Sequence, residues 1–306
     1  MSLPGKLLNK ILNFFPHVKD LRRRIQDYEK YIAFEPGHYY SPIVDPLNYA
    51  DNRNKVKESS NFPEINFNEK EQLQTLKSFK KYYDELPFKD FKKEGLRYYY
   101  CNDFFTYSDA ISLFCMIREC KPKKIIEIGS GYSSALVLDT NEHFFNSNIQ
   151  LTFIDPNTER LKKLLKENED ATIIEKKIQE VDTEIFKTLE AGDFLLIDTS
   201  HVVKSGSDVN YIYFNVLPLL KKGVNIHIHD IFFSFEYPDK WIIQENRSWN
   251  EIYLLRAYLA YNKNFKISFF NSFMEKKYKQ LIEREMPLML KRQNDNVCGG
   301  IWLETN

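Results

Sequence analysis

A glycine-rich turn follows a short apolar segment near the middle of the chain. Residues 124–128 read KIIEI, and Gly129 and Gly131 come directly after them. Two glycines between a strand and a helix let the backbone approach a ligand closely, with the amides of the helix N-terminus behind it. The third glycine of the dinucleotide-binding pattern GxGxxG is absent, because Ser134 occupies its position. Glu127, at the end of the strand, suits a ligand that carries a cation and hydroxyl groups.

A second acidic residue ends the next predicted strand. Asp155 follows residues 150–154, which read QLTFI. A carboxylate at this position of a nucleotide-binding α/β fold accepts hydrogen bonds from ribose hydroxyls. The alternative is an N-cap for a helix that begins near Thr158. The glycines and Glu127 upstream favour the nucleotide interpretation.

Acidic residues and histidines follow two later predicted strands. Asp198 and His201 come after the fourth strand, and His229 and Asp230 come after the fifth. Because neighbouring parallel strand ends lie about 5 Å apart, Asp198, His229 and Asp230 could converge on one ion or one hydroxyl. Histidine titrates near neutral pH, so His201 is a candidate general base. The alternative for His201 is a helix-cap or core histidine.

Short apolar segments alternate with helical patterns from about residue 96. This alternation predicts a parallel sheet covered by helices on both faces, which is a doubly wound α/β fold. Ligands of such sheets bind at the carboxyl ends of the strands. Strands are expected at 124–128, 150–154, 171–175, 193–197, 224–228, 265–270 and 300–304, and helices at 68–85, 111–120, 159–168, 208–220 and 249–261.

The runs IIEIGSGYSS, FIDPN, FLLIDTSH and IHIHDIF together resemble the class I S-adenosylmethionine-dependent methyltransferases, over residues 96–306. The resemblance implies a seven-stranded, mostly parallel sheet whose last strand is antiparallel. It also implies S-adenosylmethionine as the cofactor, with its ribose on Asp155 and its adenine near Gln179. The complete set of cofactor-binding residues implied is Glu127, Gly129, Ser130, Gly131, Ser133, Asp155, Gln179 and Asp198.

The IDxxH segment and the later HD pair resemble the metal-dependent sugar and small-molecule O-methyltransferases, among them the macrolide-sugar enzymes. The resemblance implies a divalent metal on Asp198, His229 and Asp230, with His201 as the base that deprotonates the acceptor hydroxyl. His229 stands where those enzymes have an acidic residue. Magnesium prefers oxygen ligands, so a histidine and two aspartates suit manganese, iron or zinc better. Without a metal, Asp198 or Asp230 would orient His201.

Residues 1–95 are expected to form a helical extension and a lid before the methyltransferase domain of residues 96–306. Residues 1–30 hold seven basic and three acidic side chains, and residues 6–15 place apolar side chains on one helical face. Such a segment could lie on a membrane surface. Packing on its own core or on a partner subunit, as in a homodimer, is favoured. Residues 37–43 are the candidate lid over the cofactor.

The composition narrows the class of protein. The 306 residues include 43 Lys plus Arg and 43 Asp plus Glu, a balance that argues against a nucleic-acid-binding protein. No apolar run approaches the roughly 20 residues of a membrane-spanning helix. The four cysteines form no CxxC pair, so a reducing, cytoplasmic setting is expected.

The sequence therefore predicts methyl transfer from S-adenosylmethionine to a hydroxyl of a small molecule, such as a bacterial sugar, glycan or secondary metabolite. An NAD-dependent oxidoreductase is one alternative, and the missing third glycine argues against it. The other alternative is a non-catalytic protein that kept the fold and uses its basic N-terminus as a docking arm. Glu127 and Asp155 favour cofactor binding over this alternative, but they do not show catalysis.

Overall fold

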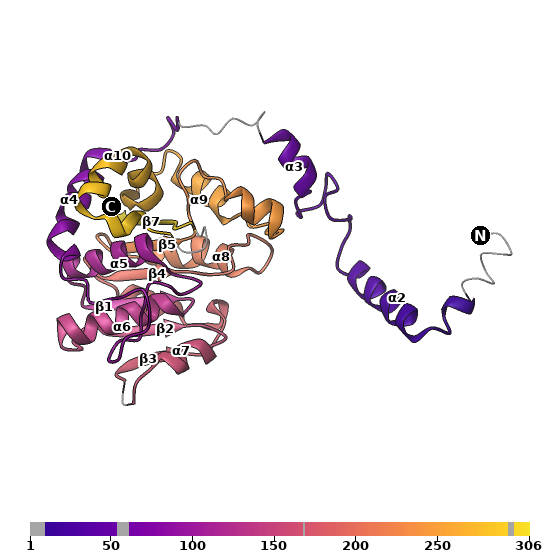
Figure 1. Cartoon of the computed structure of the whole chain (residues 1–306), viewed down its shortest axis with the longest axis horizontal. Coiled ribbons are helices and arrows are strands. Elements are labelled where there is room, and N and C mark those ends of the chain that lie inside the picture. Colours follow the sequence, from indigo (N-terminus) through magenta and orange to yellow (C-terminus); the bar gives the residue numbers. More distant parts are fainter. Residues whose placement is uncertain (1–9, 54–60, 168, 293–296) are drawn as a thin grey trace. The chain divides into compact units, whose positions relative to one another are not determined.

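The computed structural model describes residues 10–53, 61–167, 169–292 and 297–306. The chain divides into two compact units, one formed by residues 1–57 and 239–248 and the other by residues 58–238 and 249–306. The second unit, which we call the sheet unit, contains every strand of the described chain (Figure 1). Among the described residues, no helix is both long and apolar enough to cross a membrane.

The sheet has the predicted architecture. Its strand order is β3-β2-β1-β4-β5-β7-β6, and β7 pairs antiparallel with β5 and β6 while the remaining pairs are parallel. The doubly wound, mostly parallel fold is confirmed. The strands are β1 (Lys124–Ile128), β2 (Gln150–Ile154), β3 (Ala171–Ile174), β4 (Phe194–Ile197), β5 (Asn225–His229), β6 (Phe265–Phe270) and β7 (Gly300–Thr305).

The register brings the functional strand ends together. Ile128 at the end of β1 pairs with Ile154 of β2 and with Ile197 of β4. Ile197 in turn pairs with Ile228 of β5. Both faces of β4 and β5 are buried, as expected for a parallel sheet, with apolar side chains on both faces of β4 and with His227 and His229 on one face of β5. The polar residues that follow each strand therefore lie along one edge.

Helices flank the sheet (Figure 1). They are α5 (Tyr107–Cys120), α6 (Tyr132–Phe145), α7 (Glu159–Leu164), α8 (Asp208–Tyr211), α9 (Glu251–Leu259) and α10 (Asn271–Glu285). The prediction of a single helix over 208–220 was wrong in part. After α8 the chain forms a π-helical turn at Ile212–Val216 and a 3-10 turn at Leu217–Leu219. Pro218 lacks the N–H that a continuing α-helix needs.

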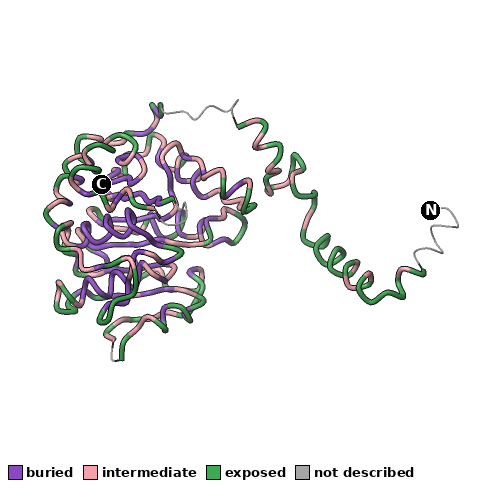
Figure 2. The backbone as a smooth tube through the Cα atoms, in the orientation of Figure 1, coloured by how far each residue is buried: buried purple, intermediate pink, exposed green. Residues whose placement is uncertain are grey.

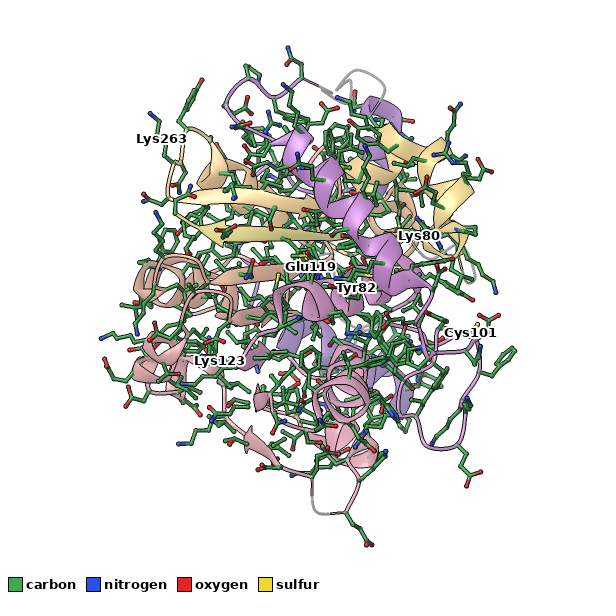
Figure 3. The ribbon with its side chains drawn as sticks, turned by 90° about the vertical axis from the view of Figure 1, so that its left-hand side faces the viewer. Lys80, Tyr82, Cys101, Glu119, Lys123 and Lys263 are labelled. Atoms are coloured by element: carbon green, nitrogen blue, oxygen red, sulfur yellow. The ribbon has the colours of Figure 1, made fainter. Side chains whose placement is uncertain are left out.

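The units do not follow the predicted boundary after residue 95. Helix α4 (Glu69–Tyr83) belongs to the sheet unit, and Figure 3 shows it with Lys80 and Tyr82 labelled. Its apolar side explains this, because Leu76 and Phe79 are fully buried. The ring of Phe79 lies 4.9 Å from that of Phe269 in β6, centroid to centroid.

The first unit contains α2 (Pro16–Glu29), α3 (Pro46–Asn52) and a π-helical turn at Lys240–Gln244. Tyr49 of α3 donates a hydrogen bond to Asp239 at 3.3 Å, which ties the N-terminal segment to residues 239–248. Of the predicted helix over 6–15, residues 6–9 lie outside the described residues and residues 10–12 are helical. Exposed residues run along α2, whereas buried residues fill the sheet unit (Figure 2).

Candidate functional site

The turn after β1 requires glycine at its first position only. Gly129 has a φ of +84°, and a Cβ there would collide with the backbone carbonyl of Asp198. Gly131 has an extended φ of 177°, and its Cβ would lie 3.6 Å from Arg160, an ordinary contact. Gly129 is thus needed for the turn itself. The missing side chain at Gly131 leaves space beside the turn.

Glu127 lies behind this turn with almost no exposure to solvent. Ser133 donates a hydrogen bond to its Oε1, and its Oε2 has no hydrogen-bond partner among the described residues. Burial raises the pKa of Glu127 to about 8, although Ser133 and Ser134 lower it. A buried carboxyl with a free oxygen favours a ligand that donates a hydrogen bond or carries positive charge.

Asp155 closes the same turn from β2. Its Oδ2 accepts hydrogen bonds from Ser130 N at 2.8 Å and from Ser130 Oγ at 2.9 Å. Its Oδ1 accepts from Asn157 N at 2.7 Å. Asp155 does not cap the following helix, because the N-cap of α7 is Thr158. The carboxylate is instead held at the rim of a cavity.

This cavity has a volume of about 490 Å³, within the range of small-molecule sites. Four of the predicted cofactor residues line it, namely Gly129, Asp155, Gln179 and Asp198. Gln179 reaches across it and donates a hydrogen bond to the carbonyl oxygen of Gly206 at 2.9 Å. The other predicted cofactor residues are not among the lining residues. Ser130 and Gly131 are in the turn, Glu127 is at the end of β1, and Ser133 is in the first turn of α6.

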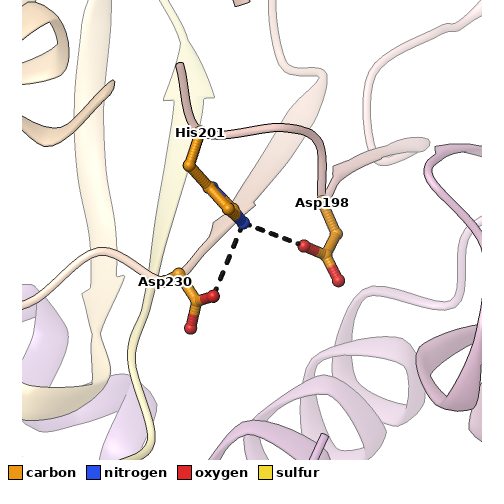
Figure 4. A group of neighbouring side chains, drawn as sticks. All are labelled: Asp198, His201 and Asp230. Carbon is orange, nitrogen blue, oxygen red and sulfur yellow. Dashed lines mark ion pairs between the residues drawn. The ribbon is translucent and has the colours of Figure 1, made fainter. Parts of the chain in front are cut away.

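Asp198, His201 and Asp230 come together beside the cavity (Figure 4). His201 Nε2 lies 3.3 Å from Asp198 Oδ1 and 3.5 Å from Asp230 Oδ2. One potential ligand atom from each residue lies within 4.8 Å of the other two. The three residues predicted as catalytic are therefore neighbours in space. Asp198 belongs both to this cluster and to the cavity wall.

His229 approaches the same two carboxylates from β5. Its Nδ1 lies 3.5 Å from Asp198 Oδ1 and 3.7 Å from Asp230 Oδ1. Its Nε2 lies 3.5 Å from Oδ2 of Asp109, a buried residue of α5. Asp109 also accepts hydrogen bonds from Asn271 at 2.9 Å and from the Gly299 amide at 3.1 Å. Asp109 therefore lies behind His229, on the side of the ring away from Asp198 and Asp230.

Glu251 is the residue of this site that sequence reasoning missed. Its Oε2 lies 2.9 Å from Nδ1 of His201, and both side chains are buried. The backbone amides of Asn250 and Glu251 also donate to the His201 carbonyl, at 3.0 Å and 3.1 Å. Glu251 begins α9, fifty residues after His201, and nothing in the local pattern links the two segments.

Two residues of the cluster have backbone conformations that are uncommon outside glycine. His201 has a φ of +58° and Asp230 a φ of +56°. Such conformations cost free energy and persist where the surroundings fix them. For Asp230, the amide donates to the Gly299 carbonyl at 2.7 Å. The backbone conformations of His201 and Asp230 therefore orient their side chains toward each other, and the backbone hydrogen bonds of these residues stabilise those conformations.

The carboxylates shift the titration of both histidines. Burial opposes a charged His201, yet Asp198, Glu251 and Asp230 raise its pKa to about 10. Burial likewise opposes a charged His229, and the charges of Asp230 and Asp198 raise its pKa well above its usual range. Despite burial, the same histidines hold the pKa of Asp198 well below its ordinary value. The ligand-free site thus balances its carboxylates with protons, and an arriving cation would compete with them.

Several other polar and aromatic residues near the strand ends make structural contacts. His227 packs against Trp302 at a ring-centroid distance of 4.8 Å, and burial lowers its pKa to about 3. Asp208 accepts from the amide and the hydroxyl of Ser200 and so closes the loop after β4. Trp241 belongs to the other unit. The aromatic rings buried in the sheet unit include Tyr98, Tyr100, Tyr107, Phe232, Phe235 and Tyr237.

The chain has the strand order of a doubly wound α/β protein, with an antiparallel last strand. Its cavity lies at the carboxyl ends of the strands and is lined by Asp155 and Asp198, as in the nucleotide-binding members of this class. A family model described as a methyltransferase domain matches residues 126–231. An uncharacterized protein of Archaeoglobus fulgidus is 32% identical over 163 residues, which cover 51% of this chain and 74% of that protein. Residues 126–231 therefore belong to a family of methyltransferase domains.

Solved structures of methyltransferases resemble the chain more distantly. The plantazolicin methyltransferase BpumL, in complex with an analogue and SAH, is 16% identical with a TM-score of 0.42, covering 85% of this chain and 93% of its own. The SAH-bound Podospora anserina methyltransferase PaMTH1 is 15% identical with a TM-score of 0.41, covering 64% and 77%. The O-methyltransferase TomG of Streptomyces achromogenes, with SAM, is 12% identical with a TM-score of 0.41, covering 63% and 78%.

Proposed function

We propose that this protein transfers the methyl group of S-adenosylmethionine to a hydroxyl oxygen of a small molecule. The position of Asp198 carries the proposal, because this residue lines the cavity and also contacts His201. The cavity supplies Asp155 and Gln179 for a nucleoside. A sulfonium methyl held at the inner end of that cavity would lie next to the histidine that receives the acceptor's proton.

In the proposed reaction, His201 is the general base. A carboxylate only accepts hydrogen bonds, so Nδ1 of His201 carries the hydrogen shared with Glu251. The raised pKa keeps the ring charged in the ligand-free site, so the proton on Nε2 must leave when a bound cation offsets the charge of Asp198 and Asp230. In the resulting neutral ring, Nε2 has a lone pair that faces these two carboxylates. The hydroxyl oxygen forms the bond to the methyl carbon as the carbon–sulfur bond breaks, and the hydroxyl proton passes to Nε2. The products are S-adenosylhomocysteine and the methyl ether.

We also propose a divalent metal on Asp198, His229 and Asp230. The residues fit such an ion, because His229 Nδ1 is buried, makes no hydrogen bond among the described residues and faces both carboxylates. The separations of 3.5 and 3.7 Å are close to the spacing of about 3.4 Å between ligands on a tetrahedral ion with bonds of about 2.1 Å. When bound, a metal would make the acceptor hydroxyl more acidic and orient it.

The aromatic side chains next to His201 favour an acceptor with an uncharged ring, such as a sugar. The half-buried ring of Trp249 lies 4.5 Å from that of His201, and the buried ring of Tyr237 packs against Trp249 at 5.9 Å. Aromatic faces of this kind pack against the apolar face of a ring while a hydroxyl reaches the base. We assign the activity to a reducing, cytoplasmic compartment, consistent with four free cysteines.

Calorimetric titration of the full chain with S-adenosylmethionine and, separately, with NAD tests the cofactor. We expect binding of S-adenosylmethionine by the wild-type chain and its loss in Glu127→Ala and Asp155→Ala. Glu94→Ala, an exposed position in the sheet unit, is the matched control and should bind normally. A response to NAD alone would establish a dehydrogenase. Silence with both ligands would establish the non-catalytic alternative.

Release of S-adenosylhomocysteine in the presence of hydroxyl-bearing acceptors tests the reaction. Sugars, glycans and phenols form one acceptor set, and amines and thiols of matched size form the other. Turnover restricted to the hydroxyl set, and lost in His201→Ala without loss of cofactor binding, is the expected result. Turnover with amines or thiols alone would overturn O-methylation and leave the methyltransferase assignment intact.

A further inference from the structure

Helix α2 carries an apolar stripe that its own unit does not bury. Val18, Leu21, Ile25 and Tyr28 follow one another at spacings of three, four and three residues. Leu21 is 41%, Ile25 57% and Tyr28 48% exposed, and no residue of α2 is buried. Spacings that alternate between three and four place these side chains on a single seam of an α-helix. Exposed apolar residues in such a row mark an interaction surface.

The stripe has the heptad pattern of a two-stranded coiled coil. Val18 and Ile25 occupy the a positions, and Leu21 and Tyr28 occupy the d positions. Side chains branched at Cβ in a, with leucine in d, favour parallel dimers over higher oligomers. This pattern distinguishes α2 from an amphipathic helix that packs on a flat surface, which needs a wider apolar face.

The charged residues of α2 agree with this assignment. Asp20 pairs with Arg23 at 2.8 Å and Asp27 pairs with Lys30 at 2.6 Å, and these pairs occupy the positions c and f on the side away from the seam. Arg24 takes position g and Glu29 takes position e, beside the seam. In a parallel pair in register, Arg24 lies next to the partner's Glu29, and the symmetry of the dimer forms this contact twice.

We propose that α2 pairs in parallel with α2 of a second copy of this chain, as a short coiled coil that dimerises the protein. Four basic and three acidic residues lie within α2, a near balance that favours pairing with an identical helix over binding to an anionic membrane. Two heptads bury few side chains, so the association is expected to be reversible and concentration-dependent. This proposal does not depend on the proposed methyltransferase activity.

Sedimentation of the full chain over a range of concentrations tests the dimer. We expect a monomer–dimer equilibrium for the wild type and an affinity weaker by about tenfold or more for Ile25→Asp, because a buried apolar pair is lost. Gln26→Asp, at position b on the outer side, is the matched control and should dimerise like the wild type. A wild type that stays monomeric at all concentrations overturns the proposal.

A charge exchange tests the parallel register. Arg24→Glu alone and Glu29→Arg alone should each weaken the homodimer, since each places like charges across the seam. A mixture of the two variants should form a heterodimer at wild-type affinity, because both cross-seam contacts are then attractive. Failure of the mixture to restore association overturns the parallel arrangement.

Two further readouts exclude other occupants of the stripe. Co-sedimentation with vesicles of phosphatidylserine and phosphatidylcholine tests a membrane, and vesicle binding by a monomeric chain would overturn the dimer. Thermal unfolding of the dilute monomer tests the chain's own sheet unit as the occupant. A marked loss of stability in monomeric Ile25→Asp would show that the chain covers its own stripe and would also overturn the proposal.

Discussion

Nδ1 of His201 and Oε2 of Glu251 lie 2.9 Å apart in the interior of the sheet unit, although the two residues are fifty positions apart in the sequence. The contact fixes the orientation of the imidazole ring and directs Nε2 toward Asp198 and Asp230. A carboxylate behind a histidine also favours the imidazolium that forms when the histidine accepts a proton. Glu251 is therefore expected to influence turnover through His201.

Replacing Glu251 with glutamine should lower kcat by about tenfold to a hundredfold, because an uncharged partner stabilises the imidazolium less. Affinity for S-adenosylmethionine should stay unchanged, since Glu251 does not line the cavity. Single-turnover measurements with calorimetric titration separate the two effects, and Glu283→Gln, an exposed position on α10, is the control. A kcat equal to that of the wild type would remove Glu251 from the proposed mechanism.

Glu127 should make the stability of the ligand-free protein depend on pH. Its pKa is about 8 in the folded chain against 4.5 ordinarily, so the folded state retains a proton that the unfolded state releases between these values. The contribution of this group is therefore present at low pH and is lost as pH rises from about 4.5 to 8. Relative to the wild type, Glu127→Gln should gain up to a few kcal/mol over this window.

Urea unfolding of the wild type and of Glu127→Gln at intervals from pH 5 to pH 9 measures this difference. Glu180→Gln, on the surface of the same unit, should follow the wild-type curve. A difference between wild type and Glu127→Gln that does not change with pH would show that Glu127 is not held protonated in the fold.

The two glycines of the first turn should respond differently to alanine. Gly129→Ala should destabilise the protein by at least about 1–2 kcal/mol, the cost of a left-handed conformation, and the collision with the Asp198 carbonyl adds to it. Gly131→Ala should fold with wild-type stability, because its φ is extended and its Cβ has room. Thermal unfolding compares them, and equal losses in both variants would contradict the assignment of the turn.

Gly131→Ala should affect cofactor binding, although it should leave the stability of the fold unchanged. If the space beside Gly131 admits the cofactor, Gly131→Ala should bind S-adenosylmethionine at least about tenfold more weakly while remaining folded. Glu94→Ala, at an exposed position of the sheet unit, is the comparison and should bind like the wild type. Unchanged affinity in Gly131→Ala would place the cofactor away from this turn.

Manganese binding should depend on the two acids and the histidine of β5. Asp230→Asn and His229→Ala should each lose Mn²⁺ binding measured by electron paramagnetic resonance, because each removes one ligand of a three-residue site. Asp103→Asn, at an exposed position, should bind as the wild type does.

The same Mn²⁺-binding measurement on His201→Ala tests whether His201 is the base or a metal ligand. As the base, His201 is dispensable for Mn²⁺ binding and required for turnover. Its Nε2 lies as near the two carboxylates as His229 Nδ1 does. Loss of Mn²⁺ binding in His201→Ala would make it a ligand and would require another base.

The sequence by itself determined the sheet and the edge at which the site lies. Five short apolar runs end in a glycine or a polar residue, and parallel strands bring their carboxyl ends to one edge whatever the intervening helices do. The sequence alone therefore predicts that Asp155, Asp198 and Asp230 lie at one edge of the sheet, and the register of β1, β2, β4 and β5 brings the ends of the strands before them to the same edge.

Only the tertiary structure decided what lies behind the two histidines. Glu251 comes from the start of α9 and Asp109 from α5, and their contacts with His201 and His229 depend on how these helices pack on the sheet. The attachment of α4 to the sheet unit has the same origin, in Leu76 and Phe79. Local periodicity fixes which face of a helix is apolar, whereas the partner of that face follows from the packing of the whole unit.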